Sequence, residues 1–347
     1  MDKRPLLVLV GGFLGAGKTR LLLRAAEILG SRGLKSAIIT NDQAEGLVDT
    51  SISARTVERV EEVSGGCFCC RFDAFASAVE RLRGHNPDAI FAEPVGSCTD
   101  LVATVLRPFR DFYGSGFSLA PLSVLVDPSR VDEILMGDSD VAYLFRKQLE
   151  EADLVCFTRA DLGIPPRPLA ARKPERFLSA KTGEGVTAWL DEISSGHLAA
   201  GGSSIELDYS RYARAEAALG WLNASFELEL ETWVPPIAVV GPLMDEIDRK
   251  LSESGARIAH LKLIDETPFG FLKAATCRIG EEPEIEGDLL SPPSSRHNMI
   301  LNVRAQTDPA VLRKVVEAAL AQMPAPVNIS ALSAFRPAPP KPMYRSA

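Results

Sequence analysis

The sequence lacks a long apolar run, an excess of positive charge and a framework of paired cysteines. No apolar run approaches the roughly 18 residues that cross a membrane, and the first residues lead straight into an expected strand, so we expect neither a membrane span nor a signal peptide. A net charge of -8 argues against a nucleic-acid partner held by a general basic field. Six cysteines, three of them within four positions, are typical of a metal-binding or redox-active cluster in a cytoplasmic protein.

A glycine-rich segment near the N-terminus fits the phosphate-loop pattern G-x-x-x-x-G-K-[ST]. It follows an apolar run of strand composition at 6–10 and precedes leucines and alanines at helical spacing. Glycines let backbone N–H groups approach phosphate oxygens at a helix N-terminus. Lys18 is expected to contact the β- and γ-phosphates and the Thr19 hydroxyl to bind Mg²⁺. The flanking elements disfavour the alternative, a turn that binds nothing. The residues expected to contact the nucleotide here are Gly12, Gly15, Ala16, Gly17, Lys18, Thr19 and Arg20.

Two carboxylates follow expected strands where nucleotide hydrolases bind Mg²⁺. Asp42 follows the apolar segment 36–40, and Glu93 follows the segment 88–92. Ligands of open α/β sheets lie at the carboxyl ends of the strands, and a carboxylate followed three positions later by glycine, here Gly96, is where the γ-phosphate is sensed. For Asp42 a solvated acidic loop is an equally good interpretation. The expected catalytic residues are Lys18, Asp42 and Glu93, and the expected Mg²⁺ ligands are Thr19, Asp42 and Glu93.

Cys67, Cys69 and Cys70 form a Cys-x-Cys-Cys segment directly after two glycines. The glycines allow a tight turn that aims several sulfurs at one point, and thiolates are soft ligands that suit Zn²⁺, Cu⁺ and similar ions. Three cysteines do not complete a tetrahedron, so the fourth ligand would be an acidic side chain, a water or a client. Cys98 is expected to be a packed helix residue rather than a ligand. The alternative for the segment is a set of structural or disulfide-prone thiols.

Two later segments indicate recognition of a guanine base. The first, Thr-Arg-Ala-Asp at 158–161, stands where GTPases carry N-K-x-D, whose aspartate accepts hydrogen bonds from the guanine ring, although its first two residues depart from that pattern. The second, Ser-Ala-Lys at 179–181, matches the element that offers a backbone N–H to the guanine carbonyl oxygen. The residues expected to contact the base are Thr158, Arg159, Asp161, Ser179, Ala180 and Lys181.

Length and hydrophobic pattern predict two domains in 347 residues. The expected fold class is α/β: a P-loop NTPase domain with a three-layer parallel sheet, followed by a smaller α+β domain. Two βαβ halves with an inserted strand suggest a ferredoxin-like layer in the smaller domain. A helix is expected over 209–222 and a half-exposed strand over 225–231, where apolar and acidic residues alternate. The expected boundaries are 1–198 for the GTPase domain, 199–223 for a linker and helix, 224–336 for the second domain and 337–347 for a mobile, proline-rich tail.

Three segments together resemble the CobW-type GTPases, in the metal-handling family that also contains UreG and HypB. They are Gly-Gly-Phe-Leu-Gly-Ala-Gly-Lys-Thr at 11–19, Gly-Gly-Cys-Phe-Cys-Cys at 65–70 and Glu-Pro-Val-Gly at 93–96. The match covers about the first 200 residues, and the C-terminal part resembles a CobW C-terminal domain with weaker motifs. The resemblance implies a P-loop GTPase of the SIMIBI class that acts as a GTP-dependent metallochaperone or metal-insertion factor. It also implies that the Cys-x-Cys-Cys segment binds a transition metal such as Zn²⁺ or Co²⁺ and that Asp42 lies in a switch loop.

The resemblance further implies slow GTP hydrolysis in the cytoplasm, a client metalloprotein or cofactor-assembly protein as partner, and a possible homodimer. The four histidines are not clustered, so no histidine-rich metal store is expected. Two other classes stay open. One is a nucleotide-dependent kinase or ligase, which would leave the three cysteines unexplained. The other is a binding module whose nucleotide sets its shape with little turnover.

Overall fold

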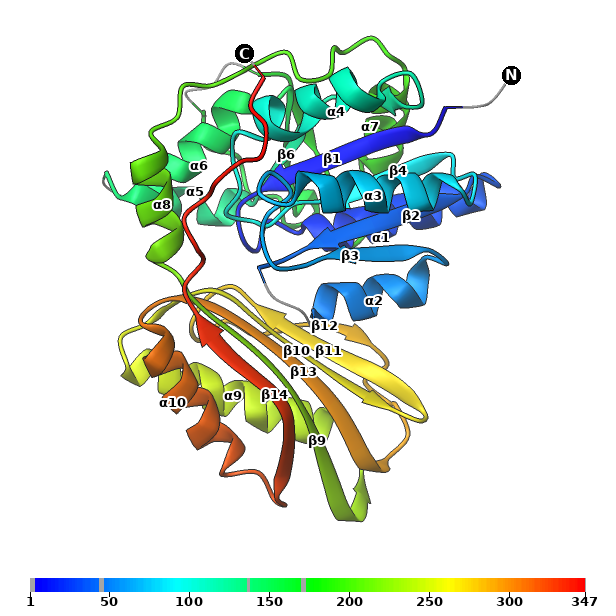
Figure 1. The fold of residues 1–347 in the computed structure, drawn as a ribbon. Coiled ribbons are helices and arrows are strands. Elements are labelled where there is room, and N and C mark those ends of the chain that lie inside the picture. The colour runs from blue at the N-terminus through cyan, green and yellow to red at the C-terminus, as the bar shows by residue number, and fades with distance from the viewer. Residues whose placement is uncertain (1–3, 44–46, 136–137, 170–172, 347) are drawn as a thin grey trace. The chain divides into compact units, whose positions relative to one another are not determined.

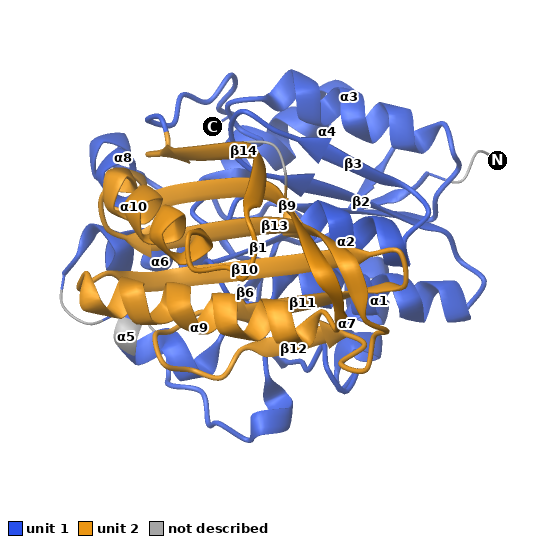
Figure 2. Ribbon diagram, turned by 90° about the horizontal axis from the view of Figure 1, so that it is seen from below, with its two compact units in different colours: residues 1–43, 49–215, 338–347 blue, residues 44–48, 216–337 orange. Residues whose placement is uncertain are grey.

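The computed structural model describes residues 4–43, 47–135, 138–169 and 173–346. These residues divide into two compact units, drawn in different colours in Figure 2. Unit 1 consists of residues 1–43, 49–215 and 338–347, and unit 2 of residues 44–48 and 216–337. Along the described residues, no helix combines the length and the apolar character that a membrane crossing requires. The domain boundaries expected at 198, 224 and 336 stay predictions.

Unit 1 is built on a parallel sheet with the strand order β3-β2-β4-β1-β6-β7-β8, in which the short β5 pairs with β1 (Figure 1). The central strands are continuous apolar runs because a parallel sheet is buried on both faces. The strands are β1 (Leu6–Gly12), β2 (Ser36–Asn41), β3 (Val60–Val63), β4 (Ala89–Glu93), β5 (Ser118–Leu119), β6 (Ser123–Val126), β7 (Leu154–Phe157) and β8 (Glu175–Phe177).

Helices cover both faces of this sheet and complete the three predicted layers (Figure 1). α1 and α7 pack together on one face, and α3, α4 and α6 lie on the other. The helices are α1 (Lys18–Ser31), α2 (Val48–Thr56), α3 (Phe72–Arg83), a π-helical turn (Val102–Leu106), α4 (Arg107–Tyr113), α5 (Val131–Leu135), α6 (Asp140–Glu151), α7 (Val186–Ser194) and α8 (Tyr209–Ala217), with short 3-10 turns at Pro128–Arg130 and Ala160–Leu162. The parallel α/β class predicted from the sequence is confirmed.

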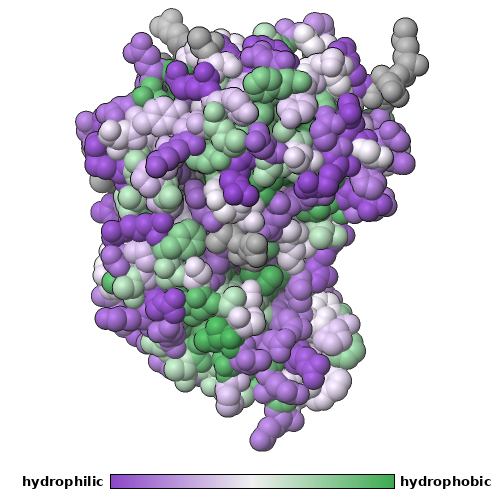
Figure 3. All heavy atoms as spheres, in the orientation of Figure 1, coloured by the Kyte–Doolittle hydropathy of each residue, from purple (hydrophilic) through white to green (hydrophobic). Residues whose placement is uncertain are grey.

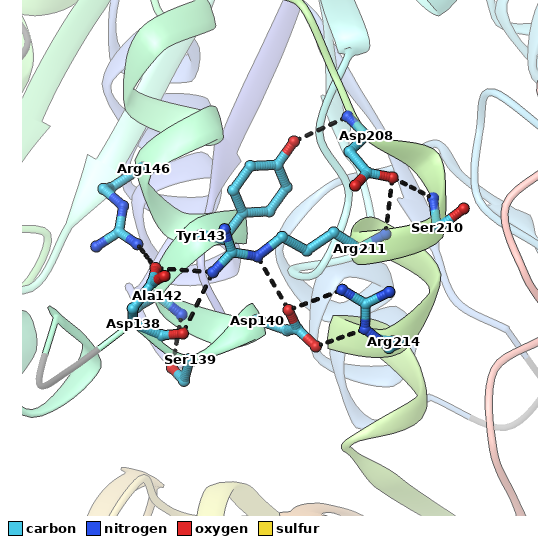
Figure 4. A network of polar contacts seen from close by, with 10 residues as sticks. All are labelled: Asp138, Ser139, Asp140, Ala142, Tyr143, Arg146, Asp208, Ser210, Arg211 and Arg214. Carbon is cyan, nitrogen blue, oxygen red and sulfur yellow. Dashed lines mark hydrogen bonds and ion pairs between the residues drawn. The ribbon is translucent and has the colours of Figure 1, made fainter.

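Paired charges fix α8 to the N-terminus of α6 (Figure 4). The guanidinium of Arg211 donates hydrogen bonds to Asp138 at 2.7 Å and to Asp140 at 3.0 Å. Arg214 donates to the other oxygen of Asp140 at 3.0 Å. The Arg211 guanidinium also lies 4.5 Å from the ring centre of Tyr143, a cation–π contact. Hydrogen bonds from Arg211 lower the pKa of the Asp138 carboxyl. These contacts attach α8 to α6 within unit 1.

Unit 2 is a single antiparallel sheet with two helices on one face. Its strand order is β12-β11-β10-β13-β9-β14. Setting β11 and β12 aside, the four remaining strands alternate with α9 and α10 in the order of a ferredoxin-like layer, as predicted. The elements are β9 (Gly220–Val234), α9 (Ile237–Glu253), β10 (Arg257–Thr267), β11 (Gly270–Thr276), β12 (Glu284–Gly287), β13 (Ser294–Gln306), α10 (Pro309–Leu320) and β14 (Val327–Phe335). On the face drawn in Figure 3, hydrophobic residues gather over β14, the edge strand, where Ile329 is 42% exposed.

The boundary between α8 and β9 differs from the predicted helix over 209–222. The helix ends at Ala217, because the next residues already pair with β13, with Leu222 opposite Val303. Leu222 is thereby buried in the core under the helices. Further along β9, Phe226 and Leu228 are buried while the intervening Glu227 is exposed, which confirms the alternation predicted for this strand.

Candidate nucleotide and metal sites

The phosphate loop joins β1 to α1 and depends on glycine at a crowded position. At Gly12, φ is +132° and a Cβ atom would lie 2.6 Å from the carbonyl oxygen of Leu125, so no other residue fits. Gly17 also has a positive φ, +88°, directly before the first helical residue. The Lys18 side chain is buried, and its ammonium donates to the Gly12 carbonyl at 2.8 Å. Backbone N–H groups and this cation therefore meet at the N-terminus of α1, which favours an anion.

A residue that sequence analysis missed also holds this loop. Arg130, buried after β6, donates to the carbonyl oxygen of Leu14 at 2.6 Å. The two residues are 116 positions apart, and nothing in the local sequence around Arg130 indicated the contact. Arg130 stabilises the backbone of the phosphate loop from outside it.

The structure brings two of the expected Mg²⁺ ligands together. The hydroxyl of Thr19 donates to Oε1 of Glu93 at 3.1 Å, and both side chains are buried. Gly96, just after Glu93, packs so closely on the loop that a Cβ atom would lie 2.8 Å from the Leu14 side chain. Asp42 follows β2, which pairs with β4 so that Thr40 lies opposite Glu93. The hydroxyl of Thr19 and the carboxylate of Glu93 are hard oxygen groups of the kind that suits Mg²⁺, and the part of Asp42 at this edge stays a prediction.

The two base-reading segments also meet. The hydroxyl of Ser179 donates to Oδ1 of Asp161 at 2.6 Å. Thr158 takes part in the sheet, since its N–H donates to the Val126 carbonyl at 2.8 Å. Arg159 adopts a left-handed backbone with φ of 56° and lies 3.4 Å from the carboxylate of Asp127. Asp161 and Ser179, one from each of these two segments, are therefore in direct contact after β7 and β8, and the contact of these segments with a base stays a prediction.

A second missed residue, Arg24, connects the phosphate helix to the base segment. Its guanidinium donates to the carbonyl oxygens of Ala180 at 3.0 Å and Lys181 at 2.8 Å. Because Arg24 lies on α1, one turn beyond the phosphate loop, it fixes the base segment relative to the loop. A half-buried arginine within a helix gave no sequence signal for this role.

The cysteine segment forms a compact cluster of thiols. The sulfur atoms of Cys67 and Cys69 lie 2.9 Å apart, those of Cys67 and Cys70 3.2 Å, and those of Cys69 and Cys70 3.8 Å. Cys67 and Cys69 are buried and Cys70 is partly exposed. The N–H of Cys70 donates to the Cys67 carbonyl, which closes the turn that converges the sulfurs. Among the described residues these three form the group of ligand atoms that could hold a metal ion.

Asn41 ties this cluster to the nucleotide side of the sheet. Its amide nitrogen donates to the carbonyls of Val63 at 2.7 Å and Gly66 at 2.8 Å, and its oxygen accepts from the Phe68 N–H at 3.0 Å. The side chain therefore holds the segment 63–68, which leads into the cysteines and includes Cys67, by hydrogen bonds at three of its residues. Asn41 is the last residue of β2 and the neighbour of Asp42.

Comparison with known proteins shows the family to which this chain belongs. The family described as CobW/HypB/UreG, nucleotide-binding domain, matches residues 6–172. The urease accessory protein UreG of Kocuria rhizophila is 31% identical over 203 residues, covering 54% of this chain and 94% of that protein. The chain belongs to the CobW/HypB/UreG family.

Other relatives of this CobW/HypB/UreG protein are named for zinc. The zinc chaperone YeiR of Escherichia coli is 28% identical over 175 residues, covering 48% of this chain and 49% of that protein. The zinc-regulated GTPase metalloprotein activator 1 of Schizosaccharomyces pombe is 27% identical over 171 residues, covering 47% of this chain and 40% of that protein. This chain therefore spans about half the length of these curated relatives.

Electrostatics within the cluster of this CobW/HypB/UreG protein favour one thiolate. Hydrogen bonds from Cys69, Cys70 and Cys98 hold the pKa of the Cys67 thiol well below its usual value. The same contact with Cys67 raises the pKa of Cys69, and it raises that of Cys70 to about 11. The neighbouring thiols thus stabilise the thiolate form of Cys67 by hydrogen bonds, and this lowers the pKa of Cys67. A metal that binds several of these sulfurs must displace their protons.

The C-terminal segment of this CobW/HypB/UreG protein packs against the cluster. The Lys341 N–H donates to the sulfur of Cys70 at 3.1 Å, and the Met343 N–H donates to the Cys69 carbonyl at 2.9 Å. The Tyr344 ring lies 5.2 Å from that of Phe72. Composition predicted a mobile tail over 337–347, and that mobility stays a prediction; in the structure Lys341, Met343 and Tyr344 contact other parts of unit 1.

Proposed function

We propose that this protein is a GTP-hydrolysing zinc chaperone. Its nucleotide state would control zinc binding at Cys67, Cys69 and Cys70, and the ion would pass to a client metalloprotein. The observation that carries the proposal is the set of three hydrogen bonds between the Asn41 side chain and the segment that carries the cysteines. Asn41 is adjacent to Asp42, at the end of a strand paired with the one that ends in Glu93. A shift of either carboxylate toward the nucleotide would therefore move the cysteine turn.

On the nucleotide side, the proposal assigns charge stabilisation to the chain's own residues. Lys18 would turn its ammonium from the Gly12 carbonyl to the β- and γ-phosphates. Thr19, Asp42 and Glu93 would hold Mg²⁺, which when bound neutralises charge on the phosphate oxygens. The carboxylates would also orient the attacking water. Hydrolysis is expected to be slow without a partner, because a switch must hold its GTP state until the client arrives.

On the base side, guanine is favoured over adenine by hydrogen-bond polarity. The Asp161 carboxylate can accept from the ring N–H and the exocyclic amino group of guanine, which adenine does not present in this arrangement. The Ser179 hydroxyl, 2.6 Å from Asp161, holds that carboxylate in place. The backbone N–H of Ala180 would meet the guanine carbonyl oxygen.

On the metal side, the donor set supports a soft or borderline ion. Sulfur atoms 2.9 to 3.8 Å apart need small adjustments to surround one ion, and thiolates suit Zn²⁺ better than Mg²⁺ or Ca²⁺. Co²⁺ accepts the same tetrahedral sulfur ligands and is the alternative cargo. Delivery would proceed by ligand exchange, with acceptor groups of the client replacing the cysteines one at a time.

Nucleotide competition and hydrolysis test the proposal. Unlabelled GTP should displace a fluorescent GDP analogue from the full-length protein far better than ATP, and Lys18→Ala should abolish binding of both. ATP competing as well as GTP would refute the guanine assignment. Hydrolysis should be measurable and should change when Zn²⁺ is added. Tight GTP binding with no hydrolysis in either condition would instead indicate a nucleotide-gated binding module.

A further inference from the structure

The C-terminal segment borders the exposed side of the cysteine cluster. Cys67 and Cys69 are buried, so Cys70 is the thiol of the cluster that an incoming group can reach from solvent. The Lys341 N–H donates to the sulfur of Cys70 at 3.1 Å. The Met343 N–H donates to the Cys69 carbonyl at 2.9 Å, which keeps the backbone of the segment beside the same turn. The segment therefore occupies part of the space around the Cys70 sulfur.

An aromatic contact holds the middle of the segment. The ring centre of Tyr344 lies 5.2 Å from that of Phe72 and 5.1 Å from that of Phe112, and both pairs are edge-to-face. Such pairs are worth more than the burial of their area alone. Phe72 is the first residue of α3, directly after the cysteine turn, while Phe112 belongs to α4 and is 58% exposed. Tyr344 therefore attaches the segment to two helices of unit 1.

Arg345 attaches the end of the segment to a buried carboxylate. Its guanidinium donates to Oδ2 of Asp100 at 2.8 Å and to the Ile205 carbonyl at 2.9 Å. The Ser346 N–H donates to the carbonyl of Ala103, in the π-helical turn, at 2.8 Å. A hydrogen bond between two charged groups is stronger than one between neutral groups. The Arg345 side chain is therefore the strongest single attachment of the segment.

We propose that residues 341–346 form a strap over the metal site and that Arg345 is the positioning residue that holds the strap in place. The strap limits access to Cys70, so a metal ion enters or leaves the cluster only while the strap is detached. This inference rests on the proposed function, because it takes zinc as the ion. It goes further by giving the C-terminal segment a part in metal transfer.

The chemistry of transfer explains why access to Cys70 matters. A thiolate of the acceptor forms a bond to zinc while the bond between zinc and the Cys70 sulfur breaks, and Cys70 leaves as a thiolate. The acceptor must approach at Cys70, because the other two cysteines are buried. The attached strap excludes the acceptor there. The rate of transfer is therefore proportional to the fraction of time that the strap is detached.

Two rates measured on the full-length protein test the strap. The first is the alkylation of Cys70 by a bulky maleimide in reduced, metal-free protein, located by mass spectrometry. The second is the transfer of zinc from the loaded protein to an excess of chelator. Arg345→Ala should raise both rates by the same factor, roughly 5- to 30-fold. The matched control is Arg336→Ala, which breaks an ion pair exposed on both sides and should change neither rate.

A second variant loosens the strap without altering its sequence. Phe112→Ala removes one aromatic partner of Tyr344 and should raise both rates by roughly 2- to 10-fold. Alkylation of Cys156, which is buried in β7, reports any general loss of structure and should stay at the wild-type rate in each variant.

The outcomes separate the strap from the proposed function. Unchanged alkylation of Cys70 in both Arg345→Ala and Phe112→Ala would overturn the strap. Faster alkylation with unchanged zinc transfer would overturn its control over the ion. A wild-type protein that binds no zinc would overturn the proposed function, and the alkylation rates would still decide whether the strap covers Cys70.

Discussion

Replacing Arg345 by alanine tests how firmly the C-terminal segment is held beside the cysteine cluster. The guanidinium donates to Oδ2 of Asp100 at 2.8 Å and to the Ile205 carbonyl at 2.9 Å. The Asp100 side chain is 1% exposed, while that of Arg345 is 43% exposed. The substitution leaves a buried carboxylate dependent on the Tyr209 hydroxyl, 2.6 Å away.

The free energy lost in Arg345→Ala is expected to lie between the value for a buried ion pair and the value for a surface ion pair. A hydrogen bond to a charged group contributes about 1.5–3 kcal/mol, and a fully exposed ion pair about 0–1 kcal/mol. Because only the Asp100 side of the pair is buried, we expect a loss of about 1–2 kcal/mol in the free energy that holds the segment down. That loss corresponds to roughly 5- to 30-fold more frequent detachment.

Hydrogen exchange of two backbone amides measures this detachment directly. The N–H groups of Met343 and Ser346 donate to carbonyls of Cys69 and Ala103 at 2.9 and 2.8 Å, so their exchange requires the segment to open. Both should exchange roughly 5- to 30-fold faster in Arg345→Ala.

The matched control replaces an arginine whose ion pair is exposed on both sides. Arg336 pairs with Asp308 at 2.9 Å, and each side chain is 52% exposed. Arg336→Ala should leave exchange at Met343 and Ser346 unchanged. Unaltered protection in Arg345→Ala, or equal acceleration in both variants, would refute the anchoring role of the Arg345 pair.

Three further predictions concern the nucleotide, the core and the metal. Arg24→Ala should weaken GDP binding about fivefold in a fluorescence titration, because it removes a hydrogen bond to the Ala180 carbonyl that contributes about 1 kcal/mol to holding the base segment. Unchanged affinity would count against a role of Arg24 in positioning that segment. Burial raises the pKa of Glu151 to about 8, well above its value in the unfolded chain. Between about pH 5 and pH 8 the folded state therefore keeps a proton that the unfolded state releases, so the melting temperature should fall as the pH rises through this range. Glu151→Gln should flatten that slope, and a parallel slope in both proteins would contradict the cause. Zinc affinity should fall as pH drops, because protons compete for the thiolates of Cys67, Cys69 and Cys70; a pH-independent affinity in a competition titration would exclude thiolate ligands.

The sequence was informative wherever a short motif carries its own geometry. The phosphate loop requires a strand, glycines and a helix within about twenty residues, so its position and both flanking elements could be predicted. The alternation of Phe and Leu with Glu over 225–231 likewise predicted which side of β9 is buried. The ferredoxin-like order followed from the succession of strands and helices.

Contacts between residues far apart in the sequence could not be predicted from local sequence patterns. Arg24 meets Ala180 across 156 positions, and Lys341 meets Cys70 across 271. The proline content of the tail predicted mobility, which stays a prediction. Composition could not show that Tyr344 and Arg345 of this tail have partners elsewhere in unit 1. The end of α8 was misplaced because strand pairing of residues 220–222 outweighed their helical spacing.

The most direct test of the account is the coupling between nucleotide and metal. Zinc should be titrated into reduced, full-length protein loaded either with a non-hydrolysable GTP analogue or with GDP. Since allosteric coupling is typically about 1–3 kcal/mol, zinc should bind roughly 5- to 150-fold tighter in the GTP form, and zinc should tighten GTP by the same factor. Equal zinc affinities in the two nucleotide states, or affinity unchanged by the double substitution Cys69→Ser and Cys70→Ser, would contradict the claim that the cysteine cluster is controlled by the nucleotide.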